Sequence, residues 1–113
     1  MKLTTIVNEL GLEVQTGKSL LDREITRGYA SDLMSDVIAH ARAGDLWVTL
    51  QVHMNVVAIA SMRDIGAIIL TQNRKPQPET EKRAIEEQVP ILISELPAFE
   101  LIGRLYGLGI AGT

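Results

Sequence analysis

The sequence predicts a single α/β domain, residues 1–113, built on a mainly parallel sheet with helices on both faces. The first observation is the alternation of strand-like and helix-like stretches from Leu46 onward, with connections of a few residues. Such alternation is typical of parallel strands joined by right-handed crossovers. The second is the continuous apolar run of residues 67–70, which suits a strand covered on both faces. The length of 113 residues is that of one ordinary domain.

The N-terminal quarter is predicted to hold one helix and two strands. Apolar residues recur at helical spacing through residues 1–11, where Gly11 is the terminator, so this segment is predicted to be an N-terminal helix. Residues 12–15 alternate apolar and polar, as a half-buried strand does, and residues 16–19 form a turn. Residues 19–25 are predicted to be an edge strand, because three consecutive charges give them an exposed face.

The middle of the chain predicts a helix, a strand and a shorter helix. Asp32 is expected to cap a helix whose apolar stripe runs from Leu33 to Ala41, with Gly44 beyond its end. Residues 46–52 are rich in strand-forming types. Asn55 is expected to cap the next helix, which ends before Gly66.

The C-terminal part continues the alternation. After the strand at residues 67–70, Pro78 suits the first position of a helix whose Ala84, Ile85 and Val89 are expected to face inward. Residues 90–94 read as another buried strand. Pro97 opens a last helix with Phe99 expected in the core, and residues 107–113 are expected to be a flexible tail.

Composition excludes several classes of function. The chain has no cysteine, which excludes disulfides and thiolate metal sites, and it has no N-terminal leader, so we expect it in the cytoplasm. The net charge is −3 and basic residues are scattered, so no nucleic-acid partner is expected. The longest charge-free run, residues 46–62, contains Gln51, His53 and Asn55 in its middle, so no membrane segment is expected.

A binding site is expected beyond the carboxyl ends of the strands, where ligands usually lie in open parallel sheets. The loop after residues 67–70 offers Thr71, Gln72, Asn73 and Arg74 at a helix start. This loop could bind a small anion through the helix start, but Glu79 and Glu81 already occupy that end and would repel it, so we favour a solvated loop over an anion site. A ligand that binds there is expected to be neutral or to contact Arg74. The flanking strand ends add three further candidate residues, Gln51, His53 and Ser94.

No catalytic or metal-binding pattern is recognised. Gly17-Lys18-Ser19 imitates the end of a phosphate-binding loop, but Leu12 stands where the first glycine is required, so we interpret it as a turn. His40 and His53, the only histidines, are expected on different elements and predict no metal site. No catalytic residues and no cofactor are predicted.

The ordered segments 22–37, 44–49, 69–71 and 89–92 together resemble the DRTGG domain, and the resemblance extends over residues 12–106. Where the family's Thr-Gly-Gly would fall, this chain has Thr71, Gln72 and Asn73. The residues that carry the signature are Asp22, Arg23, Gly28, Tyr29, Asp32 and Leu33.

The resemblance implies a non-catalytic regulatory or assembly domain with a fold similar to the N-terminal domain of the bacterial HPr kinase. It also implies a homodimer that binds a small metabolite or a protein partner, in a hydrogenase-related context. One alternative is a purely structural interaction module without a ligand, and a weaker one is a small enzyme that uses carboxylates such as Asp22, Asp32 or Asp45. Aromatic residues are candidate dimer contacts, whereas Gly103 and Gly107 are interpreted as signs of chain termination.

Overall fold

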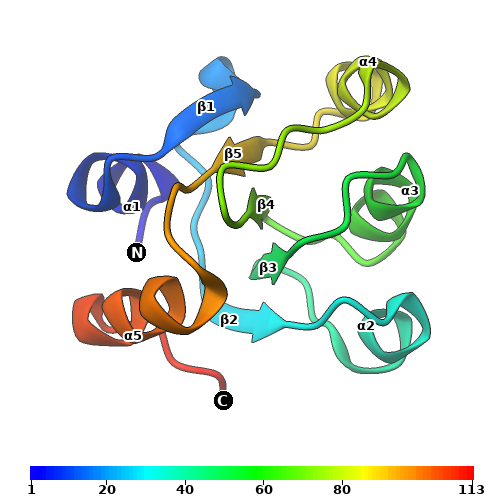
Figure 1. The fold of residues 1–113 in the computed structure, drawn as a ribbon. Coiled ribbons are helices and arrows are strands. Elements are labelled where there is room, and N and C mark those ends of the chain that lie inside the picture. Colours follow the sequence, from blue (N-terminus) through cyan, green and yellow to red (C-terminus); the bar gives the residue numbers. More distant parts are fainter.

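The computed structural model describes residues 1–113 and confirms an α/β domain with one five-stranded sheet (Figure 1). The strand order is β1-β5-β4-β3-β2, in which β2 to β5 are parallel and β1 pairs antiparallel with β5. The strands are β1 Glu13–Thr16, β2 Arg27–Ala30, β3 Asp45–Thr49, β4 Ala67–Leu70 and β5 Ile91–Ile93. The helices are α1 Leu3–Leu10, the 3-10 turn η1 Lys18–Leu20, α2 Met34–His40, α3 Asn55–Met62, α4 Pro78–Glu87 and α5 Ala98–Leu108.

Helices cover both faces of the sheet, as the sequence predicts. Figure 1 shows α1 and α5 on one face and α2, α3 and α4 on the other. Side chains alternate across a strand, so neighbouring residues of β3 enter different cores: Trp47 packs with the α2–α4 layer, and Leu46 and Val48 pack with the α1–α5 layer. No helix combines the length and the apolar character needed to cross a membrane.

The predicted edge strand at residues 19–25 is wrong, and the strand begins at Arg27 instead. Glu24 forms only an isolated bridge to Lys2. The Arg27 side chain is buried and donates two hydrogen bonds to the Asp45 carboxylate, from Nε at 2.8 Å and from Nη2 at 2.6 Å. This bidentate pair joins β2 to β3 and fixes which segment becomes the edge strand.

Several apolar residues that were expected to face inward are exposed instead. Leu33 and Ile38 on the second helical segment, and Ile85 on α4, are exposed large hydrophobic residues. Phe99, expected in the core, is 93% exposed. Helical spacing identifies an apolar stripe, but the neighbouring elements decide how wide the covered stripe is. The outer residues of these stripes therefore stay in solvent.

The C-terminal residues pack against the edge strand. α5 continues to Leu108, so it includes the start of the segment expected to be a flexible tail. Ile110 is buried, and the Gly28 N–H donates a 2.8 Å hydrogen bond to the Ala111 carbonyl. The last residues thus cover part of the open edge of β2.

Candidate functional site

The loop after β4 lies beyond the carboxyl ends of the parallel strands, as expected, and its backbone is held by the segment that follows β5. The Gln72 N–H donates to the Leu96 carbonyl at 2.9 Å, and the Asn73 N–H donates to the Ser94 carbonyl at 2.7 Å. Both of these amides are therefore occupied within the chain. The side chains of Gln72, Asn73 and Arg74 are exposed.

Two consecutive residues of this loop adopt the left-handed backbone conformation. Gln72 and Asn73 both have a φ of 56°. Glycine adopts this region freely, whereas other L-residues are strained there, with asparagine among the more tolerant. The two glycines of the Thr-Gly-Gly motif would occupy these positions without strain. The left-handed backbone is therefore enough to explain why the family motif has glycines at these two positions. No close approach of a ligand to the backbone is needed to explain them.

The three flanking residues expected at the site serve the local backbone. The Ser94 hydroxyl accepts a hydrogen bond from the Leu96 N–H at 3.1 Å. Gln51 donates from Nε2 to the Asp32 carbonyl at 3.2 Å, and His53 Nδ1 accepts from the Asn55 N–H at 3.2 Å. The His53 ring thereby satisfies an amide at the start of α3, which is the capping role expected of Asn55.

A cavity of about 200 Å³ lies at the carboxyl ends of β2, β3 and β4, beside the start of α5. Of the predicted loop residues only Thr71 lines it, together with Asp32 from the signature. The Thr71 side chain is fully buried, and its hydroxyl has no hydrogen-bond partner in the chain. A buried hydroxyl without a partner is costly. The complete lining is Ala30, Ser31, Asp32, Val48, Thr49, Leu50, Thr71 and Ala98.

The Asp32 carboxylate is placed by β3 and does not cap α2, as the sequence had suggested. Its Oδ1 accepts a hydrogen bond from the Thr49 hydroxyl and another from the Leu50 N–H, both at 2.7 Å. Its Oδ2 accepts none from the chain and remains free for a ligand. α2 begins at Met34 without a side-chain cap. Sequence spacing missed this role because the partners of Asp32 lie 17 and 18 residues away.

Opposed charges give this cavity a mixed character. The Asp32 carboxylate disfavours an anion. Ala98 is the first residue of α5, whose amino end carries partial positive charge and has no side-chain cap. A neutral ligand with both hydrogen-bond donors and acceptors therefore suits the cavity better than a simple ion.

A second, mostly apolar cavity of about 240 Å³ adjoins the first one, because the two share Ala30 and Val48 in their linings. It lies between β2 and α5, and Tyr106 is the aromatic residue of α5 that lines it. The neighbouring cavities thus place polar groups at one end of α5 and apolar groups along its length.

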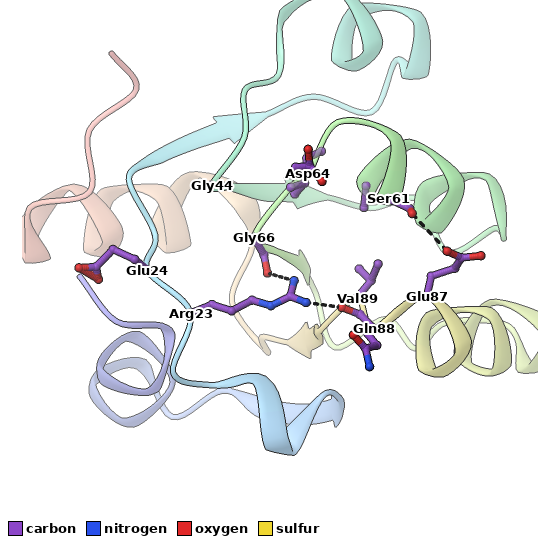
Figure 2. Close-up of a pocket in the computed structure, with 11 residues that line it drawn as sticks. Arg23, Glu24, Gly44, Ser61, Asp64, Gly66, Glu87, Gln88 and Val89 are labelled. Atoms are coloured by element: carbon purple, nitrogen blue, oxygen red, sulfur yellow. Dashed lines mark hydrogen bonds between the residues drawn. The ribbon is translucent and has the colours of Figure 1, made fainter.

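The largest cavity, of about 350 Å³, lies at the opposite end of the parallel strands and contains Arg23 from the signature (Figure 2). The Arg23 guanidinium donates to the Gln88 carbonyl at 2.7 Å and to the Gly66 carbonyl at 3.4 Å. Three carboxylates also line this cavity against one arginine, which disfavours an anionic ligand. Arg23 therefore links the segment before β2 to Gln88, which follows α4, and to Gly66, which precedes β4. Asp22 is exposed beside it.

The signature tyrosine belongs to a hydrogen-bonded group on the other side of β2. The Tyr29 hydroxyl donates to Asp36 at 2.7 Å, and His40 Nδ1 lies 3.0 Å from the second oxygen of that carboxylate. The hydrogen bond from Tyr29 is the main reason why the pKa of Asp36 is below its usual value. The same bond raises the pKa of Tyr29. This group stabilises α2 against β2 and contains no activated nucleophile.

Comparison with solved structures supports the predicted DRTGG-like fold. The chain is similar to the CBS and DRTGG domains of the regulatory region of a Clostridium perfringens pyrophosphatase, a structure complexed with its activator diadenosine tetraphosphate. The TM-score is 0.72 and the sequence identity is 14%, over 97% of this chain and 47% of that chain. The chain thus spans about half the length of that structure. No protein-family model and no curated protein matches the sequence.

Proposed function

We propose that this chain is a non-catalytic regulatory domain that binds a small metabolite in the cavity lined by Asp32 and Thr71, and that it acts as a homodimer. The unpartnered, fully buried Thr71 hydroxyl is the single observation that carries the ligand site. A ligand atom that pairs with this hydroxyl would remove its desolvation cost. Because this gain exists only in the folded protein, binding would stabilise the domain.

The chemistry of the two adjoining cavities suggests the class of ligand. The free Oδ2 of Asp32 accepts a hydroxyl or amine proton, and Thr71 can donate or accept beside it. A flat apolar group fits the neighbouring cavity, against Tyr106. A nucleoside combines these features, with sugar hydroxyls next to a flat base. The pyrophosphatase region of similar fold, whose activator is a nucleotide, supports this choice.

The test is a titration of the domain with adenosine, guanosine, adenine and diadenosine tetraphosphate, followed by thermal unfolding and calorimetry. We expect a dose-dependent rise of the melting temperature with a nucleoside, and a weaker effect with the base alone or with 2′,3′-dideoxyadenosine. Thr71→Val should weaken binding at least about tenfold, since one lost hydrogen bond is worth about 1.5 kcal/mol. Thr80→Val is the matched control, because the Thr80 hydroxyl already donates to the Val52 carbonyl at 2.8 Å.

A purely structural interaction module is the second candidate function. It predicts no thermal shift with any of these compounds, whereas Thr71→Val would then change stability only. Steady turnover of a substrate that is lost on replacing Asp32 would instead favour the carboxylate-dependent enzyme and contradict the proposal. The hydrogenase-related context remains what the family resemblance implies, and the cytoplasmic location remains a prediction from the sequence.

A further inference from the structure

The outward face of α5 exposes two aromatic side chains. Phe99 is 93% exposed and Tyr106 is 61% exposed. They lie seven residues apart, or about two helical turns, so both belong to one face of the helix. Leu101 and Leu105 form the opposite, buried face. No other helix lies outside α5 in Figure 1. The face is therefore an unpartnered aromatic surface of the kind that marks an interaction site.

Two glycines on the same helix are not required by packing within the chain. A Cβ added at Gly103 or at Gly107 would meet nothing within 4 Å. Both residues have ordinary helical φ values, so no backbone strain calls for glycine either. Glycine inside a helix is less stable than alanine. The absence of side chains there leaves a hollow next to the protruding Phe99, which packing within a single chain does not use.

We propose that α5 is the homodimer interface and that a second copy of this chain packs against it antiparallel, across a two-fold axis at Gly103. This inference rests on the dimerisation included in the proposed function and names its surface. In that register Phe99 lies at the height of the partner subunit's Gly107, and the same contact repeats in reverse. A two-fold interface must be self-complementary in this way. One bulky residue and one hollow on the same helix meet that requirement.

The charges beside this face fit the same arrangement. Glu100 and Arg104 lie on one flank of the exposed face, with Arg104 Nε 3.1 Å from Glu100 Oε2. In an antiparallel helix pair, a flank meets the same flank of the partner, so Glu100 of each subunit lies near the partner subunit's Arg104. A parallel pair would instead turn these two flanks away from each other, so neither Glu100 nor Arg104 would find an opposite charge on the partner across the interface. The flank is therefore complementary to itself in the antiparallel arrangement, which favours a second copy over an unrelated protein.

The first test is sedimentation of the whole chain over a concentration series. A single helix pair buries little area, so we expect a dimer with a dissociation constant of roughly micromolar size. Phe99→Glu should weaken it at least about 30-fold, as removal of a central aromatic does. Gly103→Ala should weaken it about tenfold while raising the melting temperature of the monomer, because helix propensity improves. Ile85→Glu, at an exposed apolar residue of α4, is the control and should leave dimerisation unchanged.

The second test reverses one charge at a time and then mixes the variants, so its result depends only on contacts between subunits. Glu100→Arg alone and Arg104→Glu alone each place like charges across the axis and should both be mainly monomeric. An equimolar mixture of the two variants should form a heterodimer by native mass spectrometry. A dimer that Phe99→Glu and the reversals leave intact would overturn the α5 interface and keep the dimer. A monomer at every concentration would overturn both, and the nucleoside titration would still decide the ligand separately.

Discussion

Thr71→Val should stabilise the free domain, although the same replacement at a comparable buried threonine should destabilise it. Thr71 is fully buried and its hydroxyl has no partner in the chain, so valine removes a polar group at almost constant shape. A buried group left unpaired costs about 1 to 3 kcal/mol. Taking the lower end, we expect the free energy of unfolding to rise by about 1 kcal/mol, which is about 4 °C for a chain of 113 residues.

Thr16 provides the matched comparison. It is 4% exposed, and its hydroxyl donates to the Val89 carbonyl and accepts from the Ile91 N–H, both at 2.9 Å. Thr16→Val leaves both backbone groups without a partner and should lower the free energy of unfolding by about 2 kcal/mol or more. The assay is urea unfolding of the two variants beside the unmodified chain, followed by circular dichroism. If Thr71→Val were as destabilising as Thr16→Val, the hydroxyl would be paired in solution, and the reasoning about the cavity would fail.

Three further predictions concern the loop, the buried ion pair and the acid range. Gln72→Gly should stabilise the domain in thermal unfolding by roughly 0.5 kcal/mol, since relief of a left-handed φ exceeds the entropy cost of glycine; a clear loss would contradict the strain argument. Asp45→Asn should cost about 3 kcal/mol in urea unfolding because Arg27 would stay buried without its anion, and a cost below about 1 kcal/mol would show that the pair is dispensable. The pKa of Asp36 is held below 3.8, chiefly by Tyr29, so this carboxylate contributes stability that is present above pH 3.8 and lost as the pH falls through its folded pKa. Tyr29→Phe should raise the pKa of Asp36 in an NMR titration and reduce the acid sensitivity of unfolding, and an unchanged pKa would refute this assignment.

Much of the sheet could be predicted from sequence because its central strands are continuous apolar runs. The run that became β4 is covered on both faces, and such burial leaves a direct pattern in the residues. The edge strand β2 lacks that pattern. Its position depends on Arg27, whose buried partner Asp45 lies 18 residues away, and no local periodicity reports such a pair. The antiparallel pairing of β1 with β5 is likewise a long-range contact.

The site that we propose lies at the end of the sheet that the sequence predicts, but it uses mostly other side chains. Topology alone places the loop of Thr71 beyond the carboxyl ends of the strands. The same rule predicted three flanking binding residues, Gln51, His53 and Ser94. Their polar groups instead form hydrogen bonds with nearby backbone atoms. The use of Asp32 and the orphaned hydroxyl of Thr71 depend on contacts between segments far apart in the sequence, so no spacing could reveal them.

The most direct test of the ligand site is an NMR titration of the isotope-labelled domain with adenosine, in which each backbone amide is followed. We predict that the shifts concentrate at Ser31, Leu50, Thr71 and Ala98, which line one cavity but come from four separate segments. In Thr71→Val the same shifts should require at least about tenfold more adenosine. An absence of shifts at millimolar adenosine, or shifts that cluster instead around Arg23 at the opposite end of the strands, would contradict the assignment of the site.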